Sequence, residues 1–311
     1  MAVLAVGILL PALLLAGPGE SGALAQASGF VRAGKLHQAE NVLRTAVAAY
    51  PKSESIHAAL GRVLFKQQKY EDAVQELGLA LQINPDSLPN SLLLSEALIG
   101  WGHFGVAAEF LQAVQNKFDK DAVFHYDLGL AYYSENKIKE AKAEFQEAVQ
   151  LGPELDRAQY LLAACIATEG DYSKAVEMFR SLVKQHPTNA MYWITLGQML
   201  PQLGSDHLPE ALQACRRART LKPHDPHIQY VTATVLMQNG DFAAARPLFE
   251  HLANLDPKEL SAHVALARIY SRLGERELAR KETAIVNQIQ QETTSQNTSA
   301  TKGNTEATQP H

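Results

Sequence analysis

The feature that most constrains the fold of this chain is an alanine that recurs at a fixed interval. Successive members of the series are 34 residues apart, except for one step of 36. A period of this length indicates a repeat protein, in which each unit packs on its neighbours and no single globular core is required. The series consists of Ala39, Ala73, Ala107, Ala141, Ala175, Ala211, Ala245 and Ala279.

Residues that interrupt helices follow the same period. A proline, or Asp119 in the third unit, stands twelve residues after each of the first seven alanines, and a glycine precedes most of the alanines by five or seven residues. Gln68 and Asn136 replace that glycine in the second and fourth units. Because proline stops a helix and glycine permits a tight turn, each unit is predicted to contain two helices joined by a turn. The residues concerned are Pro51, Pro85, Pro153, Pro187, Pro223 and Pro257, with Gly34, Gly102, Gly170, Gly204, Gly240 and Gly274.

The fourth unit shows the helical faces most clearly. Its small and apolar residues fall at i, i+3, i+4 and i+7 in the first helix, and the second helix has a similar stripe, so each helix has one packed face. These residues are His125, Leu128, Gly129 and Tyr132 in the first helix, followed by Ala141, Phe145 and Ala148 in the second.

This spacing resembles the tetratricopeptide repeat, whose pattern W-x2-L-G-x2-Y, A-x3-F, P is matched with only His125 in place of Trp. The sixth unit has the tryptophan, at Trp193. The resemblance covers about residues 20 to 290 and is to an exported bacterial type of the family. It implies an all-α, right-handed superhelical solenoid of about eight helix-turn-helix units over residues 26–286, in which small residues such as Gly129 let paired helices approach closely.

An apolar run without charge, from Ala2 to Ala16, opens the chain. It has the length of the apolar region of a signal peptide, and Ala23 and Ala25 form the small-x-small pattern that a signal peptidase needs. Residues 1–25 are therefore predicted to be a signal peptide, and the protein to be exported to the periplasm or outside the cell. No Lys or Arg precedes the run, so the alternative is an uncleaved N-terminal membrane anchor, the one membrane contact that the sequence predicts.

The last residues of the chain, 287–311, are rich in Gln, Thr, Asn and Ser and poor in hydrophobic residues. A segment of this composition lacks the apolar surface needed to order itself. It is predicted to be a disordered polar tail.

The composition and motifs argue against several kinds of chemistry. The net charge of −5 gives no basic footprint for nucleic acid, and two cysteines are too few for a disulfide framework. Phosphate-binding loops, HExxH pairs and nucleophile elbows are absent, so we expect no enzyme, no catalytic residues, no cofactor and no metal. The nearest metal-like cluster, His224, Asp225 and His227, is interpreted as a turn in which Asp225 caps a helix beginning at Pro226.

A basic run in the sixth unit permits two interpretations. Near a helix C-terminus it is a solvated face that complements the helix dipole. Alternatively, it is a patch for an acidic partner or a lipid head group. The run consists of Arg216, Arg217, Arg219 and Lys222.

The resemblance also implies a binding surface, because the first helices of tetratricopeptide units line a concave groove. Aromatic residues ringed by arginine are typical of binding hot spots. The alternative interpretation is that some of these residues are half-buried and form ridges between packed helices. The family's clamp for a C-terminal carboxylate is not expected, since its positions hold Ala58, Arg62, Glu96, Val123 and Asp127. The predicted groove residues are Arg62, Phe65, Lys66, Tyr126, Leu130, Tyr133, Arg157, Tyr160, Tyr230, Met237, Arg268 and Arg272.

These observations predict a non-enzymatic scaffold for protein–protein interaction that binds a protein or peptide segment in its groove, in the cell envelope. The alternative is a self-assembling structural solenoid without a dedicated peptide ligand, which stacks end to end or fills its groove with its own polar tail.

Overall fold

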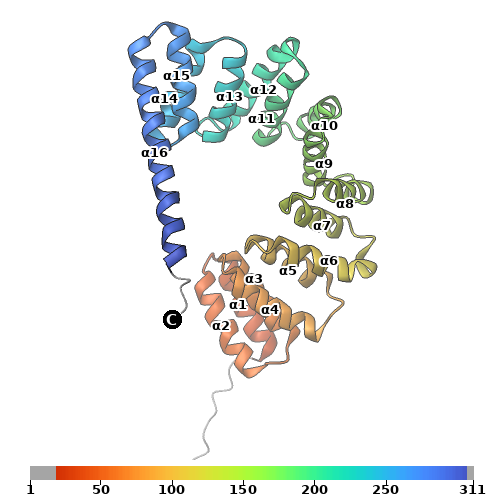
Figure 1. Ribbon diagram of the computed structural model, residues 1–311. Coiled ribbons are helices and arrows are strands. Elements are labelled where there is room, and N and C mark those ends of the chain that lie inside the picture. The colour runs from red at the N-terminus through yellow and green to blue at the C-terminus, as the bar shows by residue number, and fades with distance from the viewer. Residues whose placement is uncertain (1–18, 307–311) are drawn as a thin grey trace, which may run out of the picture. The chain divides into compact units, whose positions relative to one another are not determined.

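The structure is a computed structural model that describes the backbone of residues 19–306 and the side chains of residues 19–294 (Figure 1). Within that range it contains sixteen α-helices and two short 3-10 helices, without a strand. The predicted all-α repeat fold is therefore confirmed. Residues 1–18, which hold most of the predicted signal peptide, and residues 307–311 lie outside the described part of the chain.

The chain divides into two compact units, residues 1–154 and 155–311. Unit 1 contains four helix hairpins, in which each odd-numbered helix is the first helix of a repeat and the next is its second helix. Its helices are α1 (Glu20–Arg32), α2 (Leu36–Ala49), α3 (Glu54–Lys66), α4 (Tyr70–Ile83), α5 (Leu88–Gly100), α6 (Phe104–Phe118), α7 (Ala122–Ser134) and α8 (Ile138–Leu151).

Unit 2 contains four further hairpins. In the sixth repeat, where the alanine step is 36 residues, the 3-10 helices η1 (Leu200–Leu203, which contains Pro201) and η2 (Ser205–His207) lie between the paired helices. Pro247 lies within α14. The helices are α9 (Asp156–Thr168), α10 (Tyr172–Gln185), α11 (Ala190–Met199), α12 (Leu208–Leu221), α13 (Pro226–Gln238), α14 (Phe242–Leu255), α15 (Leu260–Leu273) and α16 (Arg276–Glu306).

The periodic alanines lie where the two helices of a hairpin meet. All of them from Ala39 to Ala245 are fully buried, and Ala279 in the last repeat is half-buried. The glycine of the opposite helix leaves the same gap free: a Cβ added to Gly129 would lie 2.7 Å from Cε1 of Phe145. Protein interiors are close-packed, so only a small residue fits at this contact. The periodic alanines and the opposing glycine therefore mark the contact between the paired helices.

The turns within the hairpins require a left-handed backbone. Besides the periodic glycines, Gln68 and Asn136 both have φ of 60°, which non-glycine residues seldom adopt. Each stands in the position that the sequence comparison of the repeats assigns to the turn. Gln68 and Asn136 thus adopt the positive φ of the glycines that they replace, whereas Gly204, in the longer turn of the sixth repeat, has φ of 119°.

The first helix, α1, extends from Glu20 to Arg32, with Ala23 and Ala27 buried. The predicted cleavage point after Ala25 therefore lies in the middle of this helix. Every helix within residues 19–306 is too short or too polar to cross a membrane.

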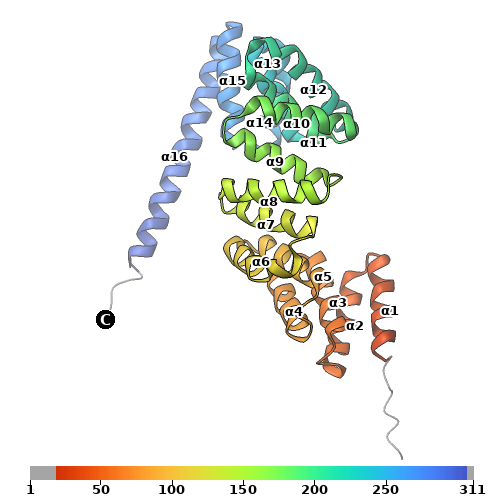
Figure 2. The ribbon, with the colours of Figure 1, turned by 90° about the vertical axis from the view of Figure 1, so that its right-hand side faces the viewer.

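The chain from Asn287 differs from the predicted disordered tail, because α16 continues as a helix to Glu306. Figures 1 and 2 show α16 running well past the end of α15. An ion pair of 3.0 Å joins Lys258, in the turn before α15, to Glu292, and Gln288 donates a hydrogen bond to the same carboxylate. The sequence from Asn287 to Gln309 contains no proline, so nothing in it removes a helical hydrogen bond although its composition is polar.

Candidate protein-binding groove

In unit 1 the first helices α1, α3, α5 and α7 are successive neighbours, and a hollow of about 290 Å³ separates α3 from α5. Three predicted groove residues of α3 line it together with aliphatic residues of α5. The full lining is Arg62, Phe65, Lys66, Pro89, Leu92, Leu93 and Glu96. The structure therefore brings Arg62, Phe65 and Lys66 to one site.

A second hollow, of about 250 Å³, lies on the other side of α3, against α1. Its lining is mostly apolar and includes Leu24, Val31 and Ala59. Arg62 and Lys66 border both hollows. Two cations on one helix thus stand between two apolar depressions.

The inner side of α3 explains why these cations face outward. Ile56, Leu60 and Leu64 are buried at i, i+4 and i+8 and fill the hairpin core. Arg62 and Lys66 are exposed, and neither forms an ion pair with a residue that the structure describes.

Phe65 forms a fixed wall of the groove. Its side chain is half-buried, and its ring meets the ring of Tyr70 edge to face, with centroids 5.8 Å apart. Aromatic pairs prefer this geometry and hold one another in place.

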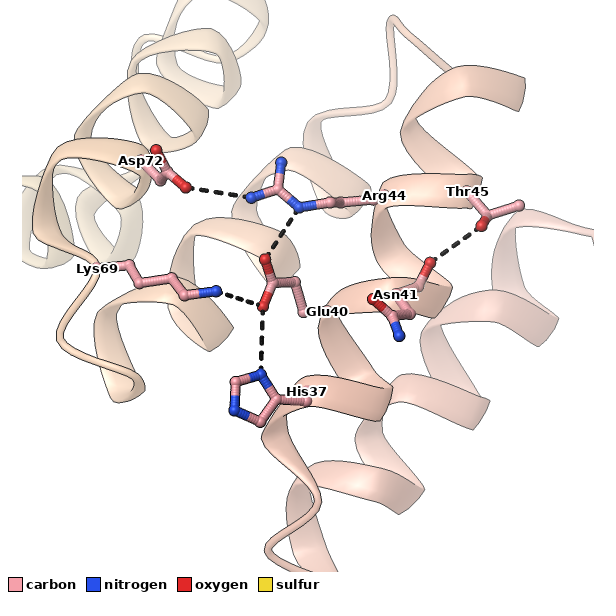
Figure 3. Close-up of polar contacts among 7 residues, drawn as sticks. All are labelled: His37, Glu40, Asn41, Arg44, Thr45, Lys69 and Asp72. Atoms are coloured by element: carbon pink, nitrogen blue, oxygen red, sulfur yellow. Dashed lines mark hydrogen bonds and ion pairs between the residues drawn. The ribbon is translucent and has the colours of Figure 1, made fainter.

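A buried carboxylate in the first repeat holds the turn at the end of α3. Glu40 accepts hydrogen bonds from Lys69 Nζ at 2.8 Å and from Arg44 Nε at 2.9 Å, with His37 Nδ1 at 3.9 Å (Figure 3). Arg44 also donates to Asp72 at 3.1 Å. Burial alone raises the pKa of Glu40, but the hydrogen bonds from Lys69 and Arg44 outweigh it and lower the pKa to about 2. This charged cluster fixes α2 to the turn between α3 and α4.

Three more predicted residues, Tyr126, Leu130 and Tyr133, lie half-buried on α7. The centroid of the Phe145 ring lies 6.0 Å from that of Tyr126 and 6.5 Å from that of Tyr133. One face of each tyrosine therefore packs on the hairpin core, which agrees with the ridge interpretation. The exposed part of each tyrosine lies on α7, which follows α1, α3 and α5 in the series of first helices.

In unit 2 the predicted residue Tyr160 is occupied by structural contacts. Its ring stacks on Tyr192 with centroids 5.5 Å apart, and its hydroxyl lies 3.3 Å from that of Thr195. Tyr192 in turn donates a hydrogen bond of 2.8 Å to Asp156, and burial together with this bond raises the pKa of Tyr192. Tyr160 thus joins α9 to α11.

The other predicted residues of unit 2 are dispersed. Tyr230 is 38% exposed, with its ring edge on Phe249, and Met237 packs against the same core cluster. The guanidinium of Arg272 lies 5.9 Å from the ring centroid of Phe242. Arg157 and Arg268 are exposed.

Sequence reasoning missed the aliphatic residues of α5. Leu92 stands 34 residues before Tyr126, and Pro89 stands 68 residues before Arg157, so the repeat register was sufficient to place both on the groove. Leu130 and Met237 were the two predicted groove residues that are neither aromatic nor cationic, and none of the predicted residues lay in α5. The clamp for a C-terminal carboxylate is not formed, because Ala58 and Asp127 are buried and Asp127 accepts a hydrogen bond from Ser95.

The structure shows where the other candidate chemical groups lie. Asp225 caps α13 by accepting the Ile228 amide at 3.1 Å, as predicted. Among the described residues no three His, Cys, Asp or Glu side chains are placed to hold a metal ion. Cys165 and Cys215 are buried free thiols, and burial raises the pKa of Cys215 to about 11, which keeps it protonated at neutral pH.

Comparison with known proteins agrees with this architecture. Family models described as tetratricopeptide repeat match residues 24–87, 126–190 and 167–226 in one case and residues 64–128 and 236–296 in another. The peroxisomal targeting signal receptor of Saccharomyces cerevisiae is 26% identical over 220 residues, which are 68% of this chain and 36% of the receptor. The chain thus spans about a third of that relative's length.

Solved structures show the same fold at low sequence identity. A tetratricopeptide repeat protein from Parabacteroides merdae has a TM-score of 0.64 at 15% identity, covering 79% of this chain and 97% of that one. YrrB, a TPR protein with an unusual peptide-binding site, has a TM-score of 0.50 at 18% identity, covering 62% of this chain and 98% of that one. With helix hairpins in a 34-residue register and family matches over more than half of its 311 residues, the chain belongs to the tetratricopeptide repeat family.

Proposed function

We propose that this protein is a non-enzymatic interaction scaffold that binds a segment of a partner protein across α1, α3 and α5 of unit 1. The observation that carries the proposal is the pair of apolar hollows on either side of α3, both bordered by Arg62 and Lys66. Apolar side chains of the segment enter the hollows, and each fully buried leucine-sized side chain contributes about 1.5–3 kcal/mol. Carboxylates of the segment pair with the two cations.

The relatives support a binding role of this kind. The yeast relative is named as a receptor for a targeting signal, and YrrB is described as having a peptide-binding site. Fold alone does not determine function, so the groove residues themselves carry the proposal.

The experiment compares two variants with the same change of charge. R62E/K66E reverses the two groove cations, and R32E/K35E reverses two exposed cations of unit 1 that line neither hollow. Partners are cross-linked in extract of the native host and quantified by mass spectrometry, with helix content and thermal unfolding as folding controls. We expect R62E/K66E to lose partners that R32E/K35E keeps. Equal recovery by both folded variants would show that the groove does not bind them.

A second candidate, end-to-end self-assembly, is favoured by exposed hydrophobic residues in the last two repeats. Leu255, Val264 and Leu273 are 56%, 48% and 36% exposed, and exposed apolar side chains of this size often mark interfaces when they lie together. Sedimentation of the full chain and of a chain ending at Val286 tests this candidate. A monomer at all concentrations would exclude it.

We also propose that the protein is exported to the cell envelope, on the basis of the apolar run from Ala2 to Ala16. Cleavage after Ala25 would divide α1 and remove the buried Ala23 from the first repeat. We therefore expect the exported chain to keep Glu20, whether the leader is removed before it or retained as an anchor. The intact mass of protein from the envelope fraction checks this expectation, and a chain beginning at Gln26 would contradict it.

A further inference from the structure

The last two turns of α12 carry a cluster of cations, Arg216, Arg217, Arg219 and, as the C-cap, Lys222. We call this cluster the α12 basic ridge. Arg216, Arg217 and Lys222 are exposed, and Arg219 is half-buried. None of the four forms an ion pair with a residue in the described part of the chain. Four positive charges on one short surface repel one another unless an anion is present.

Comparison of the repeats shows that Arg216 lacks a partner that its counterparts have. Arg44 and Arg180 occupy the same position, five residues after the periodic alanine. Arg180 Nε and Nη2 donate hydrogen bonds of 2.8 and 2.6 Å to the two carboxylate oxygens of Glu210, and Arg44 Nη2 donates one of 3.1 Å to Asp72. Both acids stand one residue before the alanine of the next repeat.

For Arg216 that acidic position holds Ala244. The guanidinium instead donates from Nε to the Leu212 carbonyl of its own helix, at 3.3 Å. The remaining N–H groups of Arg216 therefore point to solvent without a carboxylate. The repeat has kept the arginine of an inter-repeat ion pair but not the acid.

Arg219 gives a second, independent indication. Its position holds Val149 in the fourth repeat and Val183 in the fifth, so its side-chain stem lies where other repeats place a hydrophobic residue. The Nε atom is shielded from solvent and has no hydrogen-bond partner within the described residues. A shielded cationic donor without an acceptor is unfavourable, and an anion bound beside it offsets the cost.

Arg216 lies in the middle of the arc that the three arginines occupy. At about 100° per residue, Arg217 and Arg219 lie roughly 100° and 60° on either side of it, so the arc covers about 160° of the helix surface. The buried residues of α12, Ala211, Ala214, Cys215 and Ala218, lie outside this arc. Arg217 Nη2 reaches the Pro187 carbonyl at 3.5 Å, next to the ridge.

We propose that the α12 basic ridge binds an acidic polypeptide segment of a partner protein, and that a carboxylate of the segment accepts hydrogen bonds from the Nη groups of Arg216, which the bond from Nε to the Leu212 carbonyl leaves available. A carboxylate is the acceptor that this arginine position takes elsewhere in the chain. The ridge is a surface separate from the α3 groove and does not depend on it.

The first test measures binding of a fluorescein-labelled hexaglutamate peptide to the full chain by anisotropy, at about 50 mM salt, where screening is modest. We expect R216E/R217E to weaken binding at least about tenfold, because both close charge contacts become repulsive. The matched control R268E/R272E changes the same number of exposed arginines in unit 2 and is expected to stay within about twofold of the unaltered chain. R62E/K66E, measured in parallel, reports whether the peptide binds at the groove instead.

A second pair of variants tests the role of Arg216 without removing any cation. A244E supplies the acid that Arg180 has in Glu210, and it is compatible with α14 because Asp241 already caps the Ala244 amide. A243E adds the same charge at the neighbouring exposed position. We expect A244E to weaken peptide binding about threefold more than A243E, by pairing with Arg216 internally.

Several outcomes would overturn the proposal. Equal weakening by R216E/R217E and R268E/R272E would show that any exposed arginine pair supports peptide binding equally, so that the ridge is not the site. Loss of binding in R62E/K66E would assign the peptide to the groove. Equal effects of A244E and A243E would remove Arg216 as the anchor. Binding to phosphatidylglycerol vesicles without binding to the peptide would identify the ridge as a lipid surface.

Discussion

The hairpins of the fourth and sixth repeats use the same register but fill it with different volumes. In the fourth repeat, α7 and α8, a Cβ on Gly129 would meet three ring atoms of Phe145. In the sixth, α11 and α12, a Cβ on Gly197 would meet Cys215 Sγ at 2.7 Å and the backbone carbonyl of Ala211 at 3.2 Å. A large ring is thus the nearest neighbour of the glycine in the first hairpin, whereas a thiol and a backbone carbonyl are its nearest neighbours in the second. The period therefore fixes which residues face each other, and their side chains fix what fills the contact.

The same two hairpins also differ in the first-helix side chain that donates a hydrogen bond to the backbone carbonyl six residues before it, which we call the polar anchor. His125 Nε2 donates to the Asp119 carbonyl at 2.9 Å, and Nδ1 lies 2.7 Å from Glu144 Oε2. Two acceptors are both satisfied when each ring nitrogen carries a proton, which is the charged form of histidine, and, against the effect of burial, Glu144 and the Asp119 carbonyl accordingly raise the pKa of His125. Trp193 makes the equivalent bond to the Pro187 carbonyl at 3.0 Å, with a ring that needs no acid.

This difference recurs along the chain. His57 pairs with Glu76 at 2.7 Å and His263 with Glu282 at 2.6 Å, each acid being 19 residues later. Where the anchor is Trp193 or Gln229, the residue in the acid's place is Ala214 or Leu248. A histidine anchor thus occurs together with its carboxylate, and neutral anchors occur without one.

The largest expected effect is the difference in stability lost when the core side chain of each hairpin is shortened. F145A removes a fully buried ring and is expected to destabilise its hairpin by about 3–5 kcal/mol, whereas C215A removes one sulfur and costs about 1 kcal/mol. Urea unfolding, with hydrogen exchange of residues 122–151 and 190–221 as the local measure, checks the difference. Equal costs would mean that the two hairpins do not differ in packing as described.

The next effect concerns the polar anchor. E144Q leaves a buried cation without its counter-charge and is expected to cost about 2 kcal/mol, since breaking a largely buried ion pair is strongly unfavourable. The double variant H125W/E144A copies the arrangement of the sixth repeat, Trp193 with Ala214, and is expected to cost less than E144Q alone. The same measurements apply. A double variant that is less stable than E144Q would contradict the equivalence of the anchors.

A smaller effect tests the closeness of approach. In a double-mutant cycle, G129A and F145L should couple by about 1 kcal/mol, because a smaller side chain relieves the whole clash. G197A and C215A should couple less, because the Ala211 carbonyl is backbone and remains in place. Equal coupling in the two cycles would indicate that the backbones are equally far apart.

The smallest expected effect is a dependence of stability on pH. Burial alone lowers the pKa of His125, but Glu144 and the Asp119 carbonyl outweigh it and raise the pKa above its ordinary value of 6.5. The stabilisation is therefore fully present below that value and is lost as the pH rises through the raised folded-state pKa. The free energy of unfolding should fall toward alkaline pH more for the unaltered chain than for H125W/E144A. Parallel pH profiles would show that this histidine is not charged in the fold.

The sequence was sufficient to predict the hairpins and their register because these depend on local chemistry. The small residues of the helix contact and the turns at Gln68 and Asn136 follow from their positions in the period. The length of α16 did not follow from the sequence, because composition shows only that the segment is polar. It does not show that Glu292 accepts a hydrogen bond from Lys258. The stacking of Tyr160 on Tyr192 did not follow from the sequence either, because it depends on how the next repeat packs. Residue type alone therefore assigned Tyr160 to the groove.

The groove and the ridge were only partly predictable for a similar reason. Arg62, Phe65 and Lys66 were identified by residue type, but the depth beside them comes from Leu92 and Leu93 of the neighbouring helix. The basic run of α12 was visible in the sequence. The proposal that it binds a carboxylate needed the structure, in which Arg180, at the position equivalent to Arg216, donates to Glu210.

The histidine anchors set a limit on how such a chain can be rearranged by gene recombination. Each His and its Glu lie on opposite helices of one hairpin, 19 residues apart. A crossover in the turn at Asn136 that joined α7 to α12 would set His125 opposite Ala214 and strand a charged ring inside the protein. Whole hairpins, and not single helices, are therefore the pieces that duplication and exchange can move without harm.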